Sequence, residues 1–244
     1  MAQDVFEHLI VCSPLLERLT LRDCDGVSQL KIDAPNLQFL DVVGSFGDVS
    51  IVNMLNVVDV SICFNESGIP CSSGSLIKFF DDLPRLQRLQ INWHFLKYLA
   101  GDALLKKLPK PCLHLKFLCF NDLEDISTAL CLIRSSPALE KLEISAIDSP
   151  YYRPDVGTVN SCLDDNHSCS FIQLRNVKIT GISGVEADLN FIRFLLLSSP
   201  VLETMTVCAK HEQLDLGIEP LDLVKQLLRL RRASPSLEII YLDK

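Results

Sequence analysis

Apolar residues in this chain recur in the pattern Leu-x-x-Leu-x-Leu, in which the last two apolar positions alternate with other residues. Four similar ten-residue segments carry it, each after an apolar stretch: CSPLLERLTL from Cys12, SSPALEKLEI from Ser135, SSPVLETMTV from Ser198 and ASPSLEIIYL from Ala233. Such alternation is typical of a strand with one buried face. A repeated unit that cannot bury its own apolar face must stack on its neighbours, so the pattern predicts a repeat architecture.

Nine copies of the pattern are found when any apolar residue is allowed in the leucine positions. They are Leu16/Leu19/Leu21, Leu37/Leu40/Val42, Leu55/Val58/Val60, Leu86/Leu89/Ile91, Leu115/Leu118/Phe120, Leu139/Leu142/Ile144, Leu174/Val177/Ile179, Leu202/Met205/Val207 and Leu237/Ile240/Leu242. Their starts are about 18 to 35 residues apart, which overlaps the period of about 20 to 29 residues of leucine-rich repeats and in places exceeds it. The spacing therefore predicts an irregular leucine-rich-repeat solenoid.

The segments between these copies change in character along the chain. Two weaker copies, Val27/Leu30/Ile32 and Phe46/Val49/Ile51, predict strands on the opposite, convex side. From about Ser75 onward the intervening segments show helical spacing instead, as in Leu123/Ile126/Leu130/Ile133, Leu189/Ile192/Leu196 and Leu221/Val224/Leu228. Prolines that follow these stretches end the helices. Residues 2–13 are expected to form the first helix. The fold class is thus α/β, with a parallel concave sheet and first strands, then helices, on the convex side.

A repeat of this kind offers a sheet face on which outward residues alternate with the buried leucines. We expect the concave face to bind a protein client through charged, polar and aromatic residues. These are Arg18, Thr20, Arg22, Phe39, Asp41, Arg88, Gln90, Asn92, Phe117, Asn121, Lys141 and Glu143. Phe39 and Phe117 are candidate anchors for the partner, because aromatic side chains on a polar face often carry binding energy. Burial of both rings against a neighbouring loop is the alternative.

Composition and charge limit the classes of partner. The chain has 244 residues, of which 48% are hydrophobic, and a formal net charge of −8. Phosphate neutralisation by Lys and Arg supplies most nucleic-acid affinity, so no nucleic-acid partner is expected. No run approaches the roughly eighteen apolar residues of a membrane span, and no membrane partner is expected. The start MAQDVFEHLIVC has no secretory signal character, which predicts a cytoplasmic or nuclear location.

Motifs for catalysis are missing from the sequence. There is no G-x-S-x-G, no Gly-rich phosphate loop and no H-E-x-x-H, so no catalytic residue and no cofactor are assigned. The ten cysteines are interpreted as reduced and mostly structural, although a cysteine-dependent enzyme is a remote alternative. Cys162, His167 and Cys169 cluster with two aspartates in a loop-like segment, but no second Cys/His pair accompanies them, so no metal site is expected.

Three longer segments resemble a known family. They are LRNVKITGISGVEADLNFIRFLLLSSPVLETMTV from Leu174 to Val207, the ending LLRLRRASPSLEIIYLD, and the early LTLRDCDGVSQLKIDAPNLQFLDV. All three are similar to plant F-box/FBD/LRR-repeat proteins, and the first resembles their FBD module. The resemblance implies a leucine-rich-repeat region over residues 1–170, and FBD-like repeats over residues 171–244 that continue the solenoid.

The resemblance also implies a role in ubiquitin ligation. In that family an F-box docks on the adaptor of an SCF-type E3 ubiquitin ligase, while the repeats select the client. We identify no F-box in this sequence, so binding to the adaptor is doubtful and substrate recognition by the repeats is the expected function. The alternative is a truncated or competing leucine-rich-repeat scaffold outside ubiquitin ligation.

Overall fold

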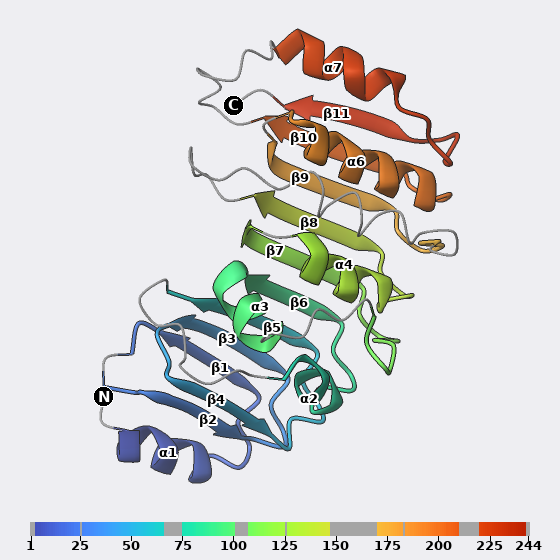
Figure 1. Ribbon diagram of the computed structural model, residues 1–244. Helices are drawn as coiled ribbons and strands as arrows, with labels where there is room; N and C mark the ends of the chain where they lie inside the picture. Colours follow the sequence, from blue (N-terminus) through green and yellow to red (C-terminus); the bar gives the residue numbers. More distant parts are fainter. Residues whose placement is uncertain are drawn as a thin grey trace.

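The apolar repeat segments form one large parallel sheet in the computed structural model of the protein (Figure 1). The structure describes residues 3–24, 26–65, 75–100, 107–124, 126–146, 170–182, 184–209 and 220–242. Within these ranges nine strands pair in parallel, in this order: β1 (Arg18–Arg22), β3 (Phe39–Gly44), β5 (Asp59–Phe64), β6 (Arg88–Asn92), β7 (Phe117–Leu123), β8 (Lys141–Ala146), β9 (Asn176–Ile182), β10 (Thr204–Ala209) and β11 (Glu238–Leu242). The predicted mixed α/β class with a parallel sheet is therefore confirmed.

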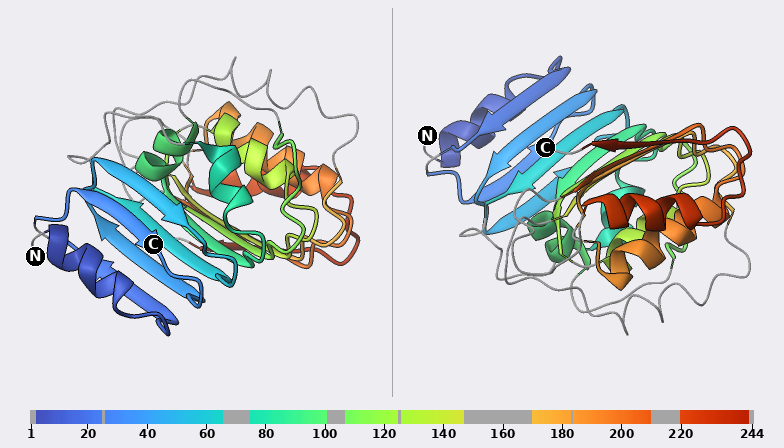
Figure 2. Two further views of the ribbon diagram at one scale, coloured as in Figure 1. Left: turned by 90° about the horizontal axis from the view of Figure 1, so that it is seen from below. Right: turned by 90° about the horizontal axis from the view of Figure 1, so that it is seen from above.

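The segments between these strands form a second layer. Near the N-terminus this layer contains a two-stranded parallel sheet of β2 (Gln29–Asp33) and β4 (Asp48–Val52), which confirms the two weaker strand predictions. The helices are α1 (Gln3–Val11), α2 (Leu76–Asp81), α3 (Trp93–Ala100), α4 (Ile126–Arg134), α6 (Glu186–Ser198) and α7 (Pro220–Arg229). Figure 2 shows α2, α3, α4, α6 and α7 on one face of the large sheet. We call this the covered face, and the opposite face the open face.

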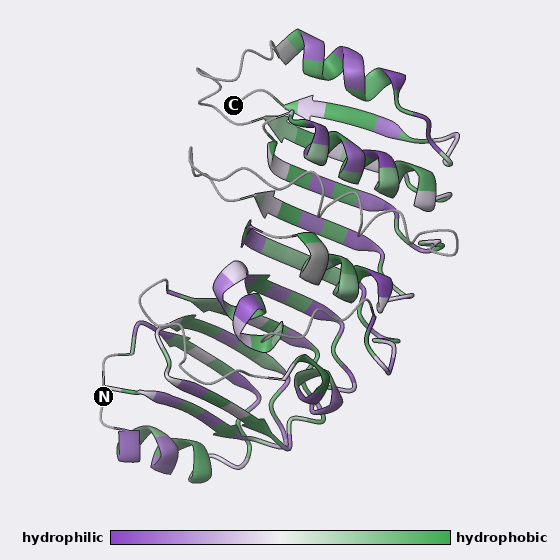
Figure 3. Ribbon diagram, in the orientation of Figure 1, coloured by the Kyte–Doolittle hydropathy of each residue, from purple (hydrophilic) through white to green (hydrophobic). Residues whose placement is uncertain are grey.

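Alternation along each strand decides which side chains meet the second layer. Leu40 and Val42 of β3, like Leu118 and Phe120 of β7, are fully buried toward the covered face. Figure 3 shows the resulting alternation of apolar and polar residues along the strands. The buried residues of both sheets and the helices form one hydrophobic core. Since successive strand residues point to opposite sides, the residues between these leucines lie on the open face.

Two serines of the Ser-Pro segment after α4 have a structural role at the end of that helix. Ser135 and Ser136 follow α4 and are buried, and their hydroxyls donate to the carbonyls of Cys131 (2.6 Å) and Leu132 (2.7 Å). The Ser135 hydroxyl also accepts the backbone N–H of Leu108 at 2.8 Å. Both carbonyls also accept the backbone N–H of Ser135, so the hydroxyls add second hydrogen bonds at the end of the helix and find partners for themselves in the core.

Two of the nine predicted repeats have the wrong register. In the third repeat Leu55 is 57% exposed, whereas Val57, Val60 and Ile62 are buried. The predicted triplet Leu55/Val58/Val60 lies two residues too early, because pairing with β3 places Val60 beside Leu40. Leu55 belongs to the turn before the strand.

The last repeat differs by a single residue. Met205 and Val207 of β10 pair with Ile239 and Tyr241, not with the predicted Ile240 and Leu242. Leu242 is accordingly exposed, while Ile239 and Tyr241 pack against the core. The connection from the proline to the strand is one residue shorter here than in the other copies, and a shift of one residue reverses the two faces of a strand.

Two predicted segments, 1–170 and 171–244, are joined by the sheet itself. Strand β8 of the first segment pairs directly with β9 of the second, with Leu142 beside Val177 and Ile144 beside Ile179. These residues belong to the same core. The large sheet therefore continues across the predicted boundary.

Candidate functional site

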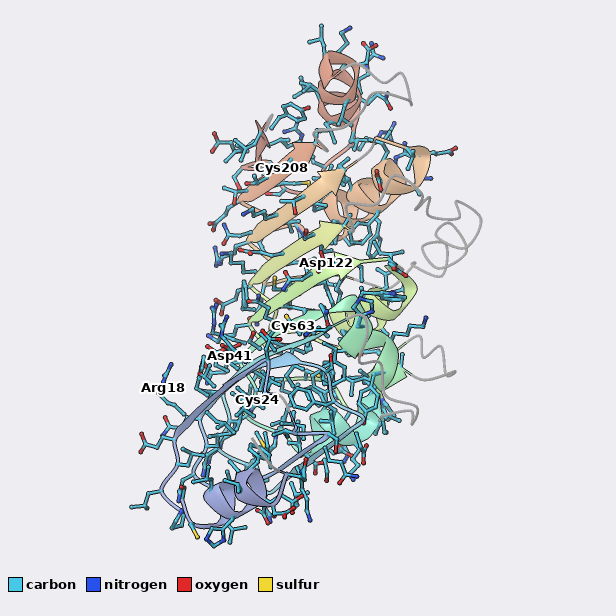
Figure 4. All side chains as sticks on the ribbon, turned by 90° about the vertical axis from the view of Figure 1, so that its left-hand side faces the viewer. Arg18, Cys24, Asp41, Cys63, Asp122 and Cys208 are labelled. Carbon is cyan, nitrogen blue, oxygen red and sulfur yellow. The ribbon has the colours of Figure 1, made fainter. Side chains whose placement is uncertain are left out.

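The open face presents its side chains in rows that run across the strands. The first row contains Arg18, Phe39, Asp59, Arg88, Phe117, Lys141, Asn176, Thr204 and Glu238, and the second contains Thr20, Asp41, Ser61, Gln90, Cys119, Glu143, Lys178, Thr206 and Ile240. Nine of the twelve predicted binding residues belong to these two rows. Arg22 and Asn121 lie one step further toward the carboxyl ends of their strands. In Figure 4, Arg18 projects from the sheet on the side away from the helices.

The first row holds stacked pairs of cations and aromatic rings. The Arg18 guanidinium lies 4.2 Å from the centroid of the Phe39 ring, and that of Arg88 lies 4.2 Å from the Phe117 ring. The Lys141 ammonium is 5.4 Å from the same Phe117 ring. Attraction between a cation and the face of an aromatic ring holds these long side chains over the sheet.

Phe117 is not the exposed anchor that the alternation predicts. Its side chain is buried, with 8% of its surface exposed, beneath Arg88 and Lys141. Phe39 is half-buried beside Arg18. The groups that cover the two rings are side chains of neighbouring strands. The alternative prediction, in which a loop buries the rings, therefore names the wrong covering group. A partner at this position would contact Arg88 and Lys141, which lie over the Phe117 ring, and not the ring itself.

Ion pairs lie on the same face, two of them between neighbouring strands and one within β8. Arg22 contacts Asp41 at 2.7 Å, Arg88 contacts Asp59 at 3.4 Å, and Lys141 contacts Glu143 at 2.7 Å. In each pair the cation is the more exposed partner, with side-chain exposures of 65%, 54% and 50% against 11%, 35% and 27% for the acids. The acids therefore form a lower layer, and the cations an upper one.

Two acids of this lower layer, Asp59 and Asp41, are partly or largely shielded from solvent. Burial raises the pKa of Asp59 above its usual value, although the positive charges of Arg88 and Arg18 oppose the shift. Asp41, predicted as an exposed binding residue, is only 8% exposed beneath Arg22. A partner on this face would meet the arginine before the aspartate.

Asn92 does not belong to the open surface, which corrects its assignment as a binding residue. It is 6% exposed. Its Oδ1 accepts the backbone N–H of Phe64 (3.1 Å), and its Nδ2 donates to the Phe64 carbonyl (2.7 Å). The same Oδ1 accepts the N–H of Phe95 (3.2 Å), in the first turn of α3. Asn92 therefore joins the end of β5 to the start of α3.

Several open-face residues were missed by the sequence prediction. Asp59 and Ser61 of β5, Lys178 of β9 and Thr206 of β10 lie in the same two rows as the predicted residues. The same alternation could have found them. For β5 the misplaced third repeat obscured the signal, since the correct apolar positions Val60 and Ile62 put Asp59 and Ser61 on the outside.

The described cysteines offer little activated thiol chemistry. Burial raises the pKa of Cys63, and raises that of Cys112 to about 12 and those of Cys119 and Cys131 to about 11. A nucleophilic cysteine needs a lowered pKa. On α1 the exposed Cys12 Sγ lies 3.4 Å from the Nε2 of His8, one helical turn away. Within the part of the chain that the structure describes, this pair is a thiol–imidazole contact from which cysteine catalysis could start.

The residues that the structure describes contain neither a candidate metal centre nor a membrane-spanning helix. No group of three or more His, Cys, Asp or Glu side chains within them could hold a metal ion. The cluster of Cys162, His167 and Cys169 lies outside the described residues. None of the helices in the described ranges combines the length and the apolar character of a membrane-spanning segment.

A family model supports an assignment for the C-terminal part of the chain. The FBD model matches residues 168–207, which include β9, α6 and most of β10. In the structure these elements form one strand–helix–strand unit in which β9 and β10 are neighbours.

Whole-chain relatives come from Arabidopsis thaliana. One F-box/FBD/LRR-repeat protein is 34% identical over 100% of this chain and 60% of its own length. A second protein so named is 22% identical over 84% of this chain and 52% of its own length. A probable FBD-associated F-box protein is 23% identical over 90% and 48%. The chain thus spans about half to three fifths of these relatives, and no solved structure matches it.

Proposed function

Because the chain belongs to the plant FBD family, we propose that it is a protein-binding module whose open sheet face recognises a client protein. Two of its relatives are named F-box/FBD/LRR-repeat proteins. In this proposal the strand repeats are leucine-rich repeats that form a solenoid, and the open face is its concave side. The observation that carries the proposal is the open face itself, where charged, polar and aromatic side chains alternate with buried leucines across nine described strands.

The proposal includes a role in ubiquitin ligation. The family resemblance implies that the repeats select the client of an SCF-type E3 ubiquitin ligase, and the relatives carry F-box in their names. The client-binding surface would then act by positioning a protein and not by catalysing a reaction. The alternative is an interaction scaffold that works outside ubiquitin ligation or competes with complete receptors.

Affinity purification of the tagged chain from plant cells tests the use of the open face. The test variant is Thr20→Trp/Lys178→Trp, which places two bulky side chains at exposed positions of the open face. The control is Lys78→Trp/Leu197→Trp, at exposed positions on helices α2 and α6 with the same change in charge. We expect the control to retain the same client as the unmodified chain, and the open-face variant to lose it. Equal recovery by both variants would refute the proposal.

The same purification, run beside a version fused to an F-box, separates the two cellular roles. Adaptor and cullin recovered together with the client from the unfused chain would support membership of a ligase. Recovery of the client from both versions, with adaptor and cullin only in the fusion, would favour the free-standing scaffold.

A further inference from the structure

The open face differs from the chain as a whole in which charged side chains are exposed. The chain carries a formal net charge of −8. Among the described strand residues of the large sheet that lie on the open face, the exposed charged side chains are the basic Arg18, Arg22, Arg88, Lys141 and Lys178 and the acidic Glu238, whereas Asp41, Asp59 and Glu143 are buried or half-buried. The exposed acids Asp23 and Asp122 lie at the carboxyl ends of β1 and β7, outside the two rows. At the centre of this face the most exposed charged side chains are therefore basic.

The ion pairs leave much of each cation exposed. Asp59 approaches the Nε atom of Arg88 at 3.4 Å from below, and a guanidinium carries five N–H donors, so one carboxylate cannot use them all. The Phe117 ring fixes the plane of the same guanidinium at 4.2 Å. Arg88 and Lys141 are thus held in place over a buried ring, and about half of each side chain is exposed, at 54% and 50%. Cations held in this way lose less conformational entropy when they bind a partner.

We infer that the open face binds an acidic, extended segment of the client protein, with carboxylates of that segment on Arg18, Arg88 and Lys141. This inference rests on the proposed function, and adds the chemical class of the partner. Charge complementarity is its basis, since a partner with Asp and Glu side chains meets the exposed upper layer of cations and is kept from the acids beneath.

The spacing of the three cations fits an extended peptide that crosses the strands. In the sheet order, Arg18 and Arg88 are three strands apart, and Arg88 and Lys141 are two strands apart. Neighbouring strands are about 4.8 Å apart, which gives separations of about 14 Å and about 10 Å. An extended chain advances about 3.3 Å per residue, so a segment of about seven residues reaches from Arg18 to Lys141.

Nucleic acid fits the same face less well. A nucleic-acid surface needs a continuous track of cations along a phosphate backbone. Here Asp59 lies between Arg18 and Arg88 in the first row, and Asp41 and Glu143 lie in the second. Single cations separated along the first row by Phe39, Asp59 and Phe117 suit separate carboxylates better than a run of phosphates.

Fluorescence polarisation with the full chain tests the inference without knowledge of the client. One probe is a labelled pool of peptides of about twelve residues, with Asp or Glu at alternate positions and no Lys or Arg. These peptides are longer than the segment of about seven residues that reaches from Arg18 to Lys141. A second pool has Asn or Gln at the same positions. The third probe is an oligothymidylate of the same length. Each is titrated from about 50 to about 300 mM NaCl, because screening weakens contacts between exposed charges.

The matched variants reverse equal amounts of charge on opposite faces. Arg88→Glu/Lys141→Glu changes the open face, and Lys78→Glu/Arg193→Glu changes exposed positions of α2 and α6. The milder Arg88→Gln/Lys141→Gln is included in case the reversal unfolds the sheet, and circular dichroism checks all three variants. We expect the acidic pool to bind at least about tenfold tighter than the amide pool, and to lose this preference in both open-face variants but not in the helix variant.

Three results would overturn the inference. They are equal binding of the acidic and amide pools, equal or tighter binding of the oligothymidylate, and unchanged binding by the folded open-face variants. If one of these results is found while Thr20→Trp/Lys178→Trp still loses the client, the proposed function stands and only the acidic character of the partner is rejected. If Thr20→Trp/Lys178→Trp captures the client as well as the helix control does, the proposed function itself is rejected.

Discussion

Single residues on this sheet show how much a side chain's role depends on its neighbours. Asn92 and Asn121 occupy equivalent positions at the ends of adjacent strands, where they pair in register. Asn92 is buried and holds both backbone groups of Phe64, whereas Asn121 is half-buried and contacts the sulfur atoms of Cys63 and Cys119. The same residue type therefore serves folding in one strand and the open surface in the next.

Replacement of Asn92 by alanine should destabilise the protein. The change removes three hydrogen bonds and leaves the N–H and carbonyl of Phe64 without their partners, so the free energy of unfolding should fall by about 2 to 4 kcal/mol. Urea denaturation measures this loss. Asn121→Ala is the control, with an expected loss of at most about 1 kcal/mol. Similar losses for the two variants would contradict the structural role assigned to Asn92.

Thiol reactivity distinguishes the binding module from a cysteine-dependent enzyme. With pKa values raised to about 12 for Cys112 and about 11 for Cys119 and Cys131, almost no thiolate forms at neutral pH. We expect iodoacetamide at about pH 7.5 to modify the exposed Cys12 at the rate of a free thiol and to leave these three unmodified in the folded protein. Peptide mass spectrometry gives the rates.

His8 provides the matched control for this measurement. If the His8–Cys12 contact at 3.4 Å activated the thiol, His8→Ala would slow its modification markedly. Faster modification of Cys12 than of a free thiol, lost in His8→Ala, would favour the enzyme alternative.

At the scale of elements, helix α7 shows that apolar spacing can fit two faces at once. Leu221 and Leu228 are seven residues apart and lie on one face, as the prediction required, but they are 64% and 59% exposed. Leu223 and Leu227, four residues apart, are buried instead. Both pairs satisfy helical periodicity, and only contact with the sheet chooses between them.

Alanine substitutions on α7 test this orientation. Leu223→Ala should lower the free energy of unfolding by about 2 to 4 kcal/mol, because it leaves a cavity in a fully buried site. Leu221→Ala should change it by no more than about 0.5 kcal/mol. Thermal denaturation of the two variants gives the comparison, and a larger loss for Leu221→Ala would reverse the assigned face.

The strands show the same dependence on partners. Alternation places Leu40 and Val42 on the covered face of β3, where the sequence predicts them. In β11 the four residues after Glu238 are all apolar: Ile239, Ile240, Tyr241 and Leu242. Either face of this strand could therefore be the buried one. Pairing with Met205 and Val207 selects Ile239 and Tyr241. A strand without a polar face gives no local signal for its register.

At the scale of the whole molecule, the large sheet sets a gradient of stability. Strands β5 to β10 pair on both sides, whereas β1 and β11 are its two edges. Amide hydrogen exchange should be slowest in β6 to β9 and much faster in β1 and β11, because edge strands open without disturbing the rest of the core. Exchange followed by mass spectrometry resolves these segments. Protection of β1 or β11 equal to that of β7 would show that something else covers that edge.

The open face also acquires its properties only in the assembled sheet. Strands that are far apart in the sequence bring Arg88, Phe117 and Lys141 together in one row. The charged upper layer and the acidic lower layer follow from these contacts. The sequence predicts most of the residues of this surface, but not which of them are exposed and which lie beneath others.

Local patterns in the sequence were sufficient to predict the parallel strands, the change from strand to helix in the second layer, the FBD resemblance and nine of the residues in the two rows. These follow from local alternation, helical spacing and motif, which depend on residues close together along the chain. Contacts in the folded chain were needed to settle the register of β11, the buried face of α7, the burial of Asn92, Asp41 and Phe117, and the exposure of the cations above them. Those properties depend on contacts between strands and layers, because the depth of a side chain is set by neighbours that no local pattern identifies.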